Sequence, residues 1–311
     1  MRREVLTAAL ALTLLVLPNA DVVGAVDGPS TVRLPAESVF PEGVAVDERT
    51  GWFYVTSNHN GSVVRGDVRT GAVRPFLPAG GDGRTSALGA EVDWTGTLWV
   101  AGGATEKVFA HDARTGALKA VYTTRAGSLP NDVVVTPGGE VFVTDSFQPV
   151  LWRIPAGAAS GPAQPWLDLT GSPIRYVPGY NLNGIVLAPD GDSLLVDQTE
   201  TGDLWRIGLA DRRVTRVDLG GFRLPGGDGM VLRDRTLFVA QPLGDLVAEV
   251  RLARDGTRGS ITGRLADPGV RFPTTVAPAG DRLLVVNSQF DRRNQGLPPD
   301  TPFTVSVIAL R

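Results

Sequence analysis

One strand–turn–strand pattern recurs along the chain and constrains its fold more than any other feature. In the clearest copy, Asn183-Gly184 opens an apolar stretch, the turn Pro189-Asp190-Gly191 reverses it, and a second apolar stretch returns. Six copies align at a spacing of about 40 to 50 residues, which is the size of a four-stranded propeller blade. We therefore predict an all-β fold, a six-bladed β-propeller with four-stranded blades.

The second strand of each copy is a continuous apolar run, such as Phe53-Tyr54-Val55 in the first. Such runs are typical of strands that are packed on both faces. The last copy ends after three strands, so we expect Ser30–Pro35 to supply its fourth strand and protect the open edge. The predicted blades span residues 40–77, 83–122, 129–169, 180–221, 224–265 and 271–310.

Residues 1–25 have the pattern of a secretory signal peptide. Arg2 and Arg3 precede the apolar run Val5–Leu17, and Val23-Gly24-Ala25 offers small residues for cleavage. The run is shorter than the roughly 20 residues of a membrane span. An uncleaved N-terminal anchor stays open as an alternative, and the arginine pair also suits a twin-arginine signal. We predict a secreted protein whose residues 26–311 form a single propeller domain.

The composition excludes several kinds of site. The chain has no cysteine, which excludes disulfides, thiolate zinc sites and iron–sulfur clusters. Its two histidines leave no three-histidine metal centre, and no Gly-x-Ser-x-Gly elbow is present for a serine triad. The net charge of −3 gives no reason to expect nucleic acid or an anionic membrane as a partner. We expect a small-molecule substrate and a monomer.

The residue that opens the first strand changes between copies but carries a strong oxygen donor in four of them. These residues are Glu42, Asn131, Asn183 and Asp228. In a propeller they would lie at one end of the innermost strands, around the central channel. Two carboxylates and two amide carbonyls suit a hard divalent cation, Ca²⁺ above all, with Mg²⁺ or Mn²⁺ as alternatives. The competing interpretation is that they cap turns and bond local backbone.

Long irregular connections fall on the same end of the predicted ring, and the longest link between blades is Thr170–Asn181. Function concentrates on such loops. The competing interpretation is that their polar residues are simply solvated. The candidate substrate or mouth residues on these loops and at strand ends are His59, Arg84, Asp145, Arg175, Tyr176 and Asn287.

Short motifs at these positions resemble the family of gluconolactonase, senescence marker protein (regucalcin) and luciferin-regenerating enzyme. The resemblance covers about residues 38 to 310 and implies a six-bladed propeller with a divalent metal in its channel. It implies Glu42, Asn183 and Asp228 as metal ligands and Asn131 as a fourth position that contacts water or substrate. The motifs are Pro41-Glu42-Gly43-Val44, Asn131-Asp132, Asn183-Gly184-Ile185, Pro189-Asp190-Gly191 and Gly227-Asp228-Gly229-Met230.

One departure from the family bears on the substrate. Sugar lactonases of the family carry an arginine shortly before the Asn-Asp pair, where it contacts substrate hydroxyls. Here Leu129-Pro130 precede Asn131. A sugar lactone is therefore a poor candidate substrate.

These residues predict a metal-dependent hydrolase of a lactone or ester. A bound metal polarises a carbonyl and acidifies water, so no covalent nucleophile is needed. We expect Asp228 to take the proton from the attacking water and Asn131 to position water or substrate. Two alternatives stay open, because one fold hosts many functions. The chain is either a related propeller enzyme for another carbonyl or cyclisation reaction, or a non-catalytic propeller that binds a ligand or protein around a structural Ca²⁺.

Overall fold

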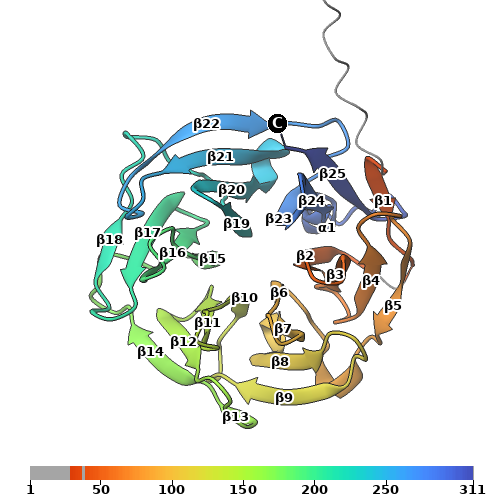
Figure 1. Cartoon of the computed structure of the whole chain (residues 1–311), viewed down its shortest axis with the longest axis horizontal. Helices are drawn as coiled ribbons and strands as arrows, with labels where there is room; N and C mark the ends of the chain where they lie inside the picture. Colours follow the sequence, from red (N-terminus) through yellow and green to blue (C-terminus); the bar gives the residue numbers. More distant parts are fainter. Residues whose placement is uncertain (1–28, 37–38, 311) are drawn as a thin grey trace, which may run out of the picture.

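Six antiparallel sheets surround a central axis in the computed structural model (Figure 1). The structure describes residues 29–36 and 39–310, so the predicted signal peptide, residues 1–25, lies outside the described residues. Every sheet contains four strands of one predicted copy, or three strands and β1 in the last blade. The predicted six-bladed propeller is confirmed.

The strands of each blade are given from the innermost to the outermost. Blade 1 contains β2 (Pro41–Asp47), β3 (Trp52–Ser57), β4 (Val63–Asp67) and β5 (Val73–Leu77), and blade 2 contains β6 (Ala90–Val92), β7 (Thr97–Ala101), β8 (Lys107–Asp112) and β9 (Leu118–Thr123). Blade 3 contains β10 (Pro130–Val135), β11 (Val141–Asp145), β12 (Val150–Ile154) and β14 (Gln164–Asp168), and blade 4 contains β15 (Leu182–Leu187), β16 (Ser193–Gln198), β17 (Asp203–Gly208) and β18 (Val214–Arg216). Blade 5 contains β19 (Met230–Arg233), β20 (Thr236–Gln241), β21 (Leu246–Leu252) and β22 (Gly259–Leu265), and blade 6 contains β23 (Pro273–Ala279), β24 (Arg282–Asn287), β25 (Thr304–Ala309) and β1 (Thr31–Arg33).

The remaining elements are short. The strand β13 (Gly161–Pro162) adds a parallel fifth strand to the outer edge of blade 2, next to β9. The one α-helix among the described residues is α1 (Phe290–Asn294), in the connection between β24 and β25, and the 3₁₀ turns are η1 (Gly81–Gly83), η2 (Gly103–Thr105) and η3 (Pro242–Gly244).

The ring closes through the predicted N-terminal strand. β1 pairs antiparallel with β25, and Val32 lies opposite Val305. Leu34 is 3% exposed and its N–H donates to Phe303 O at 2.8 Å. The first described segment therefore completes the last blade, which removes the open edge that blade 6 would otherwise present.

The hydrophobic core lies between blades. Each of its six clusters combines side chains from two neighbouring blades. In β3, Phe53 and Val55 belong to the cluster shared with blade 6, whereas Tyr54 belongs to the cluster shared with blade 2. Alternate side chains of one strand thus face opposite neighbours, which explains why the second strands are apolar throughout.

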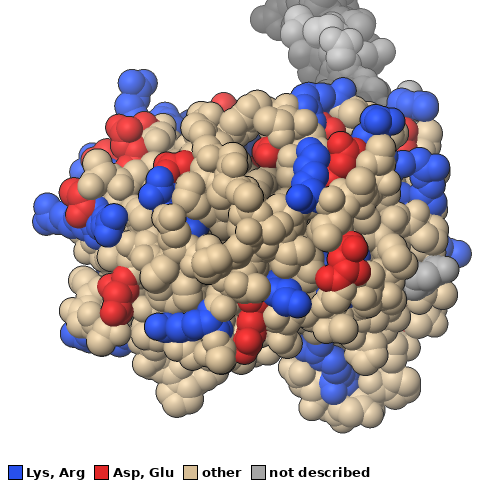
Figure 2. All heavy atoms as spheres, turned by 90° about the horizontal axis from the view of Figure 1, so that it is seen from below, with Lys and Arg blue, Asp and Glu red and all other residues tan. Residues whose placement is uncertain are grey.

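The outer surface carries both signs of charge. On the face shown in Figure 2, Lys and Arg side chains are interspersed with Asp and Glu. No helix within the described residues has the length and apolar character needed to cross a membrane.

Candidate metal centre in the central channel

The residues that open the innermost strands lie in β-bulges. The register of β2 shifts across Glu42, and β10 and β15 shift in the same way across Asn131 and Asn183. Asp228 stands at the equivalent place just before β19, where its N–H donates to Ala240 O at 3.0 Å. A bulge turns its side chain out of the regular alternation. The four predicted donors therefore occupy one structural position in four blades.

A closed ring of six hydrogen bonds, the inter-blade ring, joins each blade to the next at this level. Four bonds come from threonine hydroxyls and two from backbone N–H groups. Three of the six acceptors are the main-chain carbonyls of Glu42, Asn131 and Asn183, so the backbone of these predicted ligands is tied to a neighbouring blade. The bonds run from Thr56 Oγ1 to Leu88 O (2.7 Å), Gly89 N to Asn131 O (2.9 Å), Thr144 Oγ1 to Asn183 O (2.6 Å), Thr199 Oγ1 to Gly227 O (2.7 Å), Gly229 N to Thr274 O (2.7 Å) and Thr274 Oγ1 to Glu42 O (2.8 Å).

Glycines allow neighbouring blades to approach this closely. A Cβ on Gly43 would lie 2.4 Å from Leu88 O, and one on Gly184 would lie 2.5 Å from Asp228 O. Both distances are far below van der Waals contact, so only glycine fits without a shift of the backbone. The glycine after the opening residue in the sequence motifs is thus explained by blade packing.

Four buried oxygen atoms at this level have no hydrogen-bond partner among the described residues. They are Glu42 Oε2, Asn131 Oδ1 and both carboxylate oxygens of Asp197. The three residues are 4%, 3% and 1% exposed, respectively. Asn131 keeps its oxygen free because its amide nitrogen donates to Ser146 Oγ at 2.8 Å. Burying unpaired oxygens is costly, and a bound cation would satisfy them.

The electrostatics around Glu42 and Asp228 also favour a cation. Burial raises the pKa of Glu42 well above its ordinary value, and the charges of Asp228 and Asp132 raise it further. Burial raises the pKa of Asp228 to about 8, although hydrogen bonds from Gly229 and Asn183 oppose the rise. Carboxyl groups that disfavour one another's ionisation in this way gain from a shared positive ion.

Two acidic residues of this group, Asp132 and Asp197, were not among the predicted metal ligands. Burial and the charge of Asp228 raise the pKa of Asp197, which lies near the end of β16, well above its ordinary value. Burial raises the pKa of Asp132 to about 7, against a hydrogen bond from the Val133 N–H. The only signal in the sequence was position, since Asp132 follows Asn131 and Asp197 ends an apolar strand. We call Glu42, Asp132, Asp197 and Asp228 the acidic cluster.

A metal ion here would need amide ligands. Within the part of the chain that the structure describes, no three His, Cys, Asp or Glu side chains converge closely enough to hold an ion by themselves. The carbonyl oxygen of Asn131 is free and buried, as is Oε2 of Glu42. A mixed set of carboxylate and amide oxygens suits the oxygen-rich coordination of Ca²⁺. The donor set therefore fits a hard divalent cation, and the individual ligand assignments stay predictions.

Three of the predicted mouth residues are committed to local hydrogen bonds. Both carboxylate oxygens of Asp145 accept hydrogen bonds, including one from Trp152 Nε1 at 2.9 Å. The Tyr176 hydroxyl donates to Asp145 O at 2.6 Å. The amide of Asn287 donates to Thr304 Oγ1 at 2.8 Å. These side chains hold the loops of the mouth in place.

The other three predicted mouth residues lie in different surroundings. Arg84 is fully buried between blades 1 and 2, where it donates to Gly61 O at 2.7 Å and contacts His111 Nε2 at 3.0 Å. Burial lowers the pKa of Arg84 to about 10 and that of His111 to about 4. His59 and Arg175 are exposed on loops. The structure thus keeps Arg84 away from any substrate in the channel.

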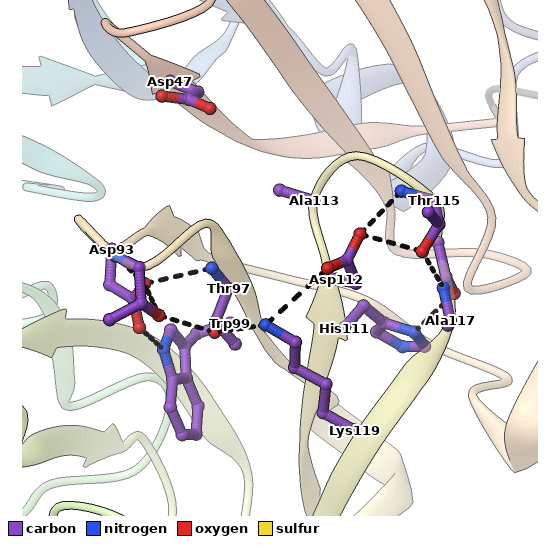
Figure 3. A network of polar contacts seen from close by, with 12 residues as sticks. Asp47, Asp93, Thr97, Trp99, His111, Asp112, Ala113, Thr115, Ala117 and Lys119 are labelled. Atoms are coloured by element: carbon purple, nitrogen blue, oxygen red, sulfur yellow. Dashed lines mark hydrogen bonds and ion pairs between the residues drawn. The ribbon is translucent and has the colours of Figure 1, made fainter.

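A cavity of about 490 Å³ continues the channel beyond the acidic cluster and is lined by all six innermost strands. Glu91 lies in its wall and accepts a hydrogen bond from the Val135 N–H at 2.8 Å. At the rim, Asp93 accepts hydrogen bonds from the Thr97 N–H and from Trp99 Nε1, as Figure 3 shows. The cavity therefore ends at a rim that is fixed by its own hydrogen bonds.

Comparison with known proteins identifies the fold. No protein-family model and no curated protein matches the sequence. Among solved structures, the calcium-binding protein regucalcin from Agrobacterium tumefaciens is similar at a TM-score of 0.64 and 17% identity, covering 91% of this chain and 95% of its own.

Two further structures are similar over most of their length. A gluconolactonase from Xanthomonas campestris has a TM-score of 0.64 and 18% identity over 90% of this chain and 89% of its own. Virginiamycin B lyase from Staphylococcus aureus has a TM-score of 0.59 and 17% identity over 83% of this chain and 80% of its own. The predicted resemblance is confirmed at the level of the fold: the chain is a six-bladed propeller like those of regucalcin and gluconolactonase.

Proposed function

We propose that the protein is a divalent-metal-dependent hydrolase of an ester or lactone. The observation that carries the proposal is the set of buried oxygens without a hydrogen-bond partner on Glu42, Asn131 and Asp197, together with the charge of Asp228, which acts on both Glu42 and Asp197. The similarity to a gluconolactonase and to a calcium-binding regucalcin supports it. We also propose that the protein is secreted, because residues 1–25 have the pattern of a signal peptide.

Each residue has a role that its surroundings support. A hard divalent cation, when bound, polarises a carbonyl oxygen and lowers the pKa of water. Glu42 in blade 1 and Asn183 in blade 4 would hold the cation. Asn131, with its amide nitrogen tied to Ser146, presents its oxygen to water or substrate. Asp228 would take the proton from the attacking water in its ionised form, which the hydrogen bonds from Gly229 and Asn183 favour and which a bound cation would favour further.

The first test is metal binding. Ca²⁺ should stabilise the parent protein by roughly 2.7 kcal/mol at a hundredfold excess over Kd, measured as a shift of Tm. Glu42→Gln should lose this shift because it removes the unpaired anionic oxygen. Glu48→Gln, an exposed glutamate of a distant turn, is the matched control. An unchanged Ca²⁺ shift in Glu42→Gln would rule out the site.

The second test is turnover. The parent should hydrolyse 4-nitrophenyl acetate or dihydrocoumarin, EDTA should abolish the reaction, and Asp228→Asn should lower kcat by about 10²- to 10⁴-fold. Reaction in H₂¹⁸O checks the source of the added oxygen, because hydrolysis places one labelled oxygen in the carboxylic acid product. Full activity in the presence of EDTA, or in Asp228→Asn, contradicts the proposal.

A further inference from the structure

One arginine near the channel is held in place by uncharged groups. Arg293 belongs to α1 (Phe290–Asn294), which lies beside β24 toward the centre of the ring (Figure 1). Its guanidinium lies 4.0 Å from the ring centroid of Phe290 and 5.5 Å from that of Phe40. Its Nη1 donates to Asn58 Oδ1 at 2.7 Å. Two aromatic faces and an amide therefore fix the direction of the guanidinium.

Arg293 has no carboxylate partner at ion-pair distance among the described residues. Its neighbour Arg292, in contrast, pairs with Asp300 at 3.3 Å. Arg293 is partly buried, and burial lowers its pKa despite the charges of Tyr180 and Glu42. If Glu42 binds a metal ion, its negative charge is balanced by that ion and not by Arg293. A partly desolvated cation without a counter-ion is unfavourable, so the site favours an incoming anion.

Arg293 contacts Phe40, which directly precedes β2, and Asn58, which directly follows β3, so it lies at the end of blade 1 where Glu42 opens β2. Its charge acts on Glu42, which is buried in the acidic cluster, and the exposed Tyr180 lies on the loop before β15. Tyr180 packs against Phe147 with ring centroids 5.5 Å apart, and the two residues are 46% and 49% exposed. Phe147 and Tyr180 thus form an exposed aromatic pair.

Most large apolar side chains that are exposed in the described residues lie on loops at this end of the ring. Exposed apolar side chains that share one end of a protein can contact the apolar part of a ligand. Together with Arg293, they favour a ligand that has one anionic group and an apolar body. Besides Phe147 and Tyr180, these side chains are Val177, Phe222, Leu243 and Leu297.

We infer that Arg293 binds the carboxylate of the substrate, so that the natural substrate is an ester or lactone with a free carboxylate and an apolar body. The inference rests on the proposed function for the ester or lactone group. A guanidinium presents paired N–H donors that match the two oxygens of a carboxylate, which an ammonium group cannot do equally well. Arg293 would select the substrate, while the oxygen donors below it carry out the reaction.

The kinetic test uses two esters of equal length that differ in charge. Mono-4-nitrophenyl glutarate carries a free carboxylate, and 4-nitrophenyl valerate carries none. Arg293→Gln should lower kcat/KM for the glutarate ester by about tenfold or more and leave that for the valerate ester within about twofold, because one charge-assisted hydrogen-bonded pair is lost. Arg293→Lys should recover part of the loss. Arg223→Gln, which removes an exposed arginine that pairs with Asp203 on the same face, is the control.

A binding test separates this inference from the proposed function. Calorimetry should detect 3-phenylpropionate but not 3-phenylpropionamide, and Arg293→Gln should abolish the binding without a change in Tm beyond that of the control. Binding without turnover of either ester refutes the hydrolase and keeps the anion site. Turnover of both esters with equal kcat/KM in parent and Arg293→Gln, or carboxylate binding unaffected by the substitution, overturns the inference. If Arg293→Gln does not fold, the same measurements are made on Arg293→Lys. A ratio of kcat/KM for the glutarate ester to kcat/KM for the valerate ester equal to the parent's would then count against the site.

Discussion

Glu91 illustrates how strongly the channel acts on a single residue. Burial raises its pKa to about 8 from an ordinary 4.5, against a hydrogen bond from the Val135 N–H. Between these two values the folded chain holds a proton that the unfolded chain releases. The free energy of unfolding therefore decreases as the pH rises from about 4.5 to 8, and the stabilising contribution is complete only below this range.

Glu91→Gln should reduce this pH dependence. The amide cannot ionise, so the free energy of unfolding should fall less steeply with rising pH than in the parent, although Asp132 and Asp228 still contribute. Urea denaturation in EDTA at several pH values between 4.5 and 8 measures the slope. Glu48→Gln should retain the parent slope. A slope equal to the parent's in Glu91→Gln would mean that Glu91 is ionised in the folded state.

Prediction from the sequence was weakest for the surroundings of individual side chains. Asp145 and Asp197 both end an apolar second strand, yet Asp145 accepts hydrogen bonds on both oxygens and Asp197 accepts none. The difference arises because the loop after Asp145 folds back with its N–H groups and Trp152, whereas Gly227 packs against Asp197. Loop geometry of this kind is not encoded in the pattern of polar and apolar residues.

Among the elements, the bulged innermost strand is the unit that builds the site. It combines an opening donor, a glycine and a carbonyl that joins the inter-blade ring. The sequence showed the four donors at a constant place in the repeat, with a glycine after all of them except Asn131, which was enough to predict that the donors share one level. It did not show the bulge, because register depends on hydrogen bonds between strands.

Gly184→Ala tests this unit. The added Cβ would lie 2.5 Å from Asp228 O and 2.8 Å from Met230 Cγ, so blades 4 and 5 must move apart. We expect a loss of about 1–3 kcal/mol in stability, as for overpacked sites, together with weaker Ca²⁺ stabilisation. Gly161→Ala has open space around its Cβ and should change neither. Parent-like stability of Gly184→Ala would show that the close approach is not required.

The helix α1 was not predicted, and this omission hid Arg293. The connection between β24 and β25 reads as a polar insertion, and a five-residue helix has too little periodicity to detect. Its functional side chain became apparent only through the packing of Arg293 against Phe40, which lies far away in the sequence.

At the scale of the whole molecule, closure of the ring was predictable because the last copy lacked a strand. Leu34 lies in the resulting cluster with Phe40, Phe303 and Val305. The cluster joins the first described residues to the last blade. A loss of packing in this cluster should therefore lower the stability of all six blades.

Leu34→Ala should therefore destabilise the propeller as one unit. We expect a loss of about 2–5 kcal/mol, the usual effect of truncating a buried leucine, with denaturation curves from tryptophan fluorescence and circular dichroism still coincident. Arg33→Ala changes an exposed side chain of the same strand and should have little effect. Separate transitions for the two probes would indicate that blade 6 unfolds independently.

The inter-blade ring has one more consequence, which concerns how such a site can change over evolutionary time. Because the ring uses backbone carbonyls and threonine hydroxyls, it does not depend on the side chains of Glu42, Asn131 or Asn183. Leu88 and Thr274 occupy the same ring in blades without a strong donor. Thr274 is the exception, because its hydroxyl donates to Glu42 O. The other opening positions are free to vary individually, so the charge and the number of ligands can change one blade at a time while the ring stays the same.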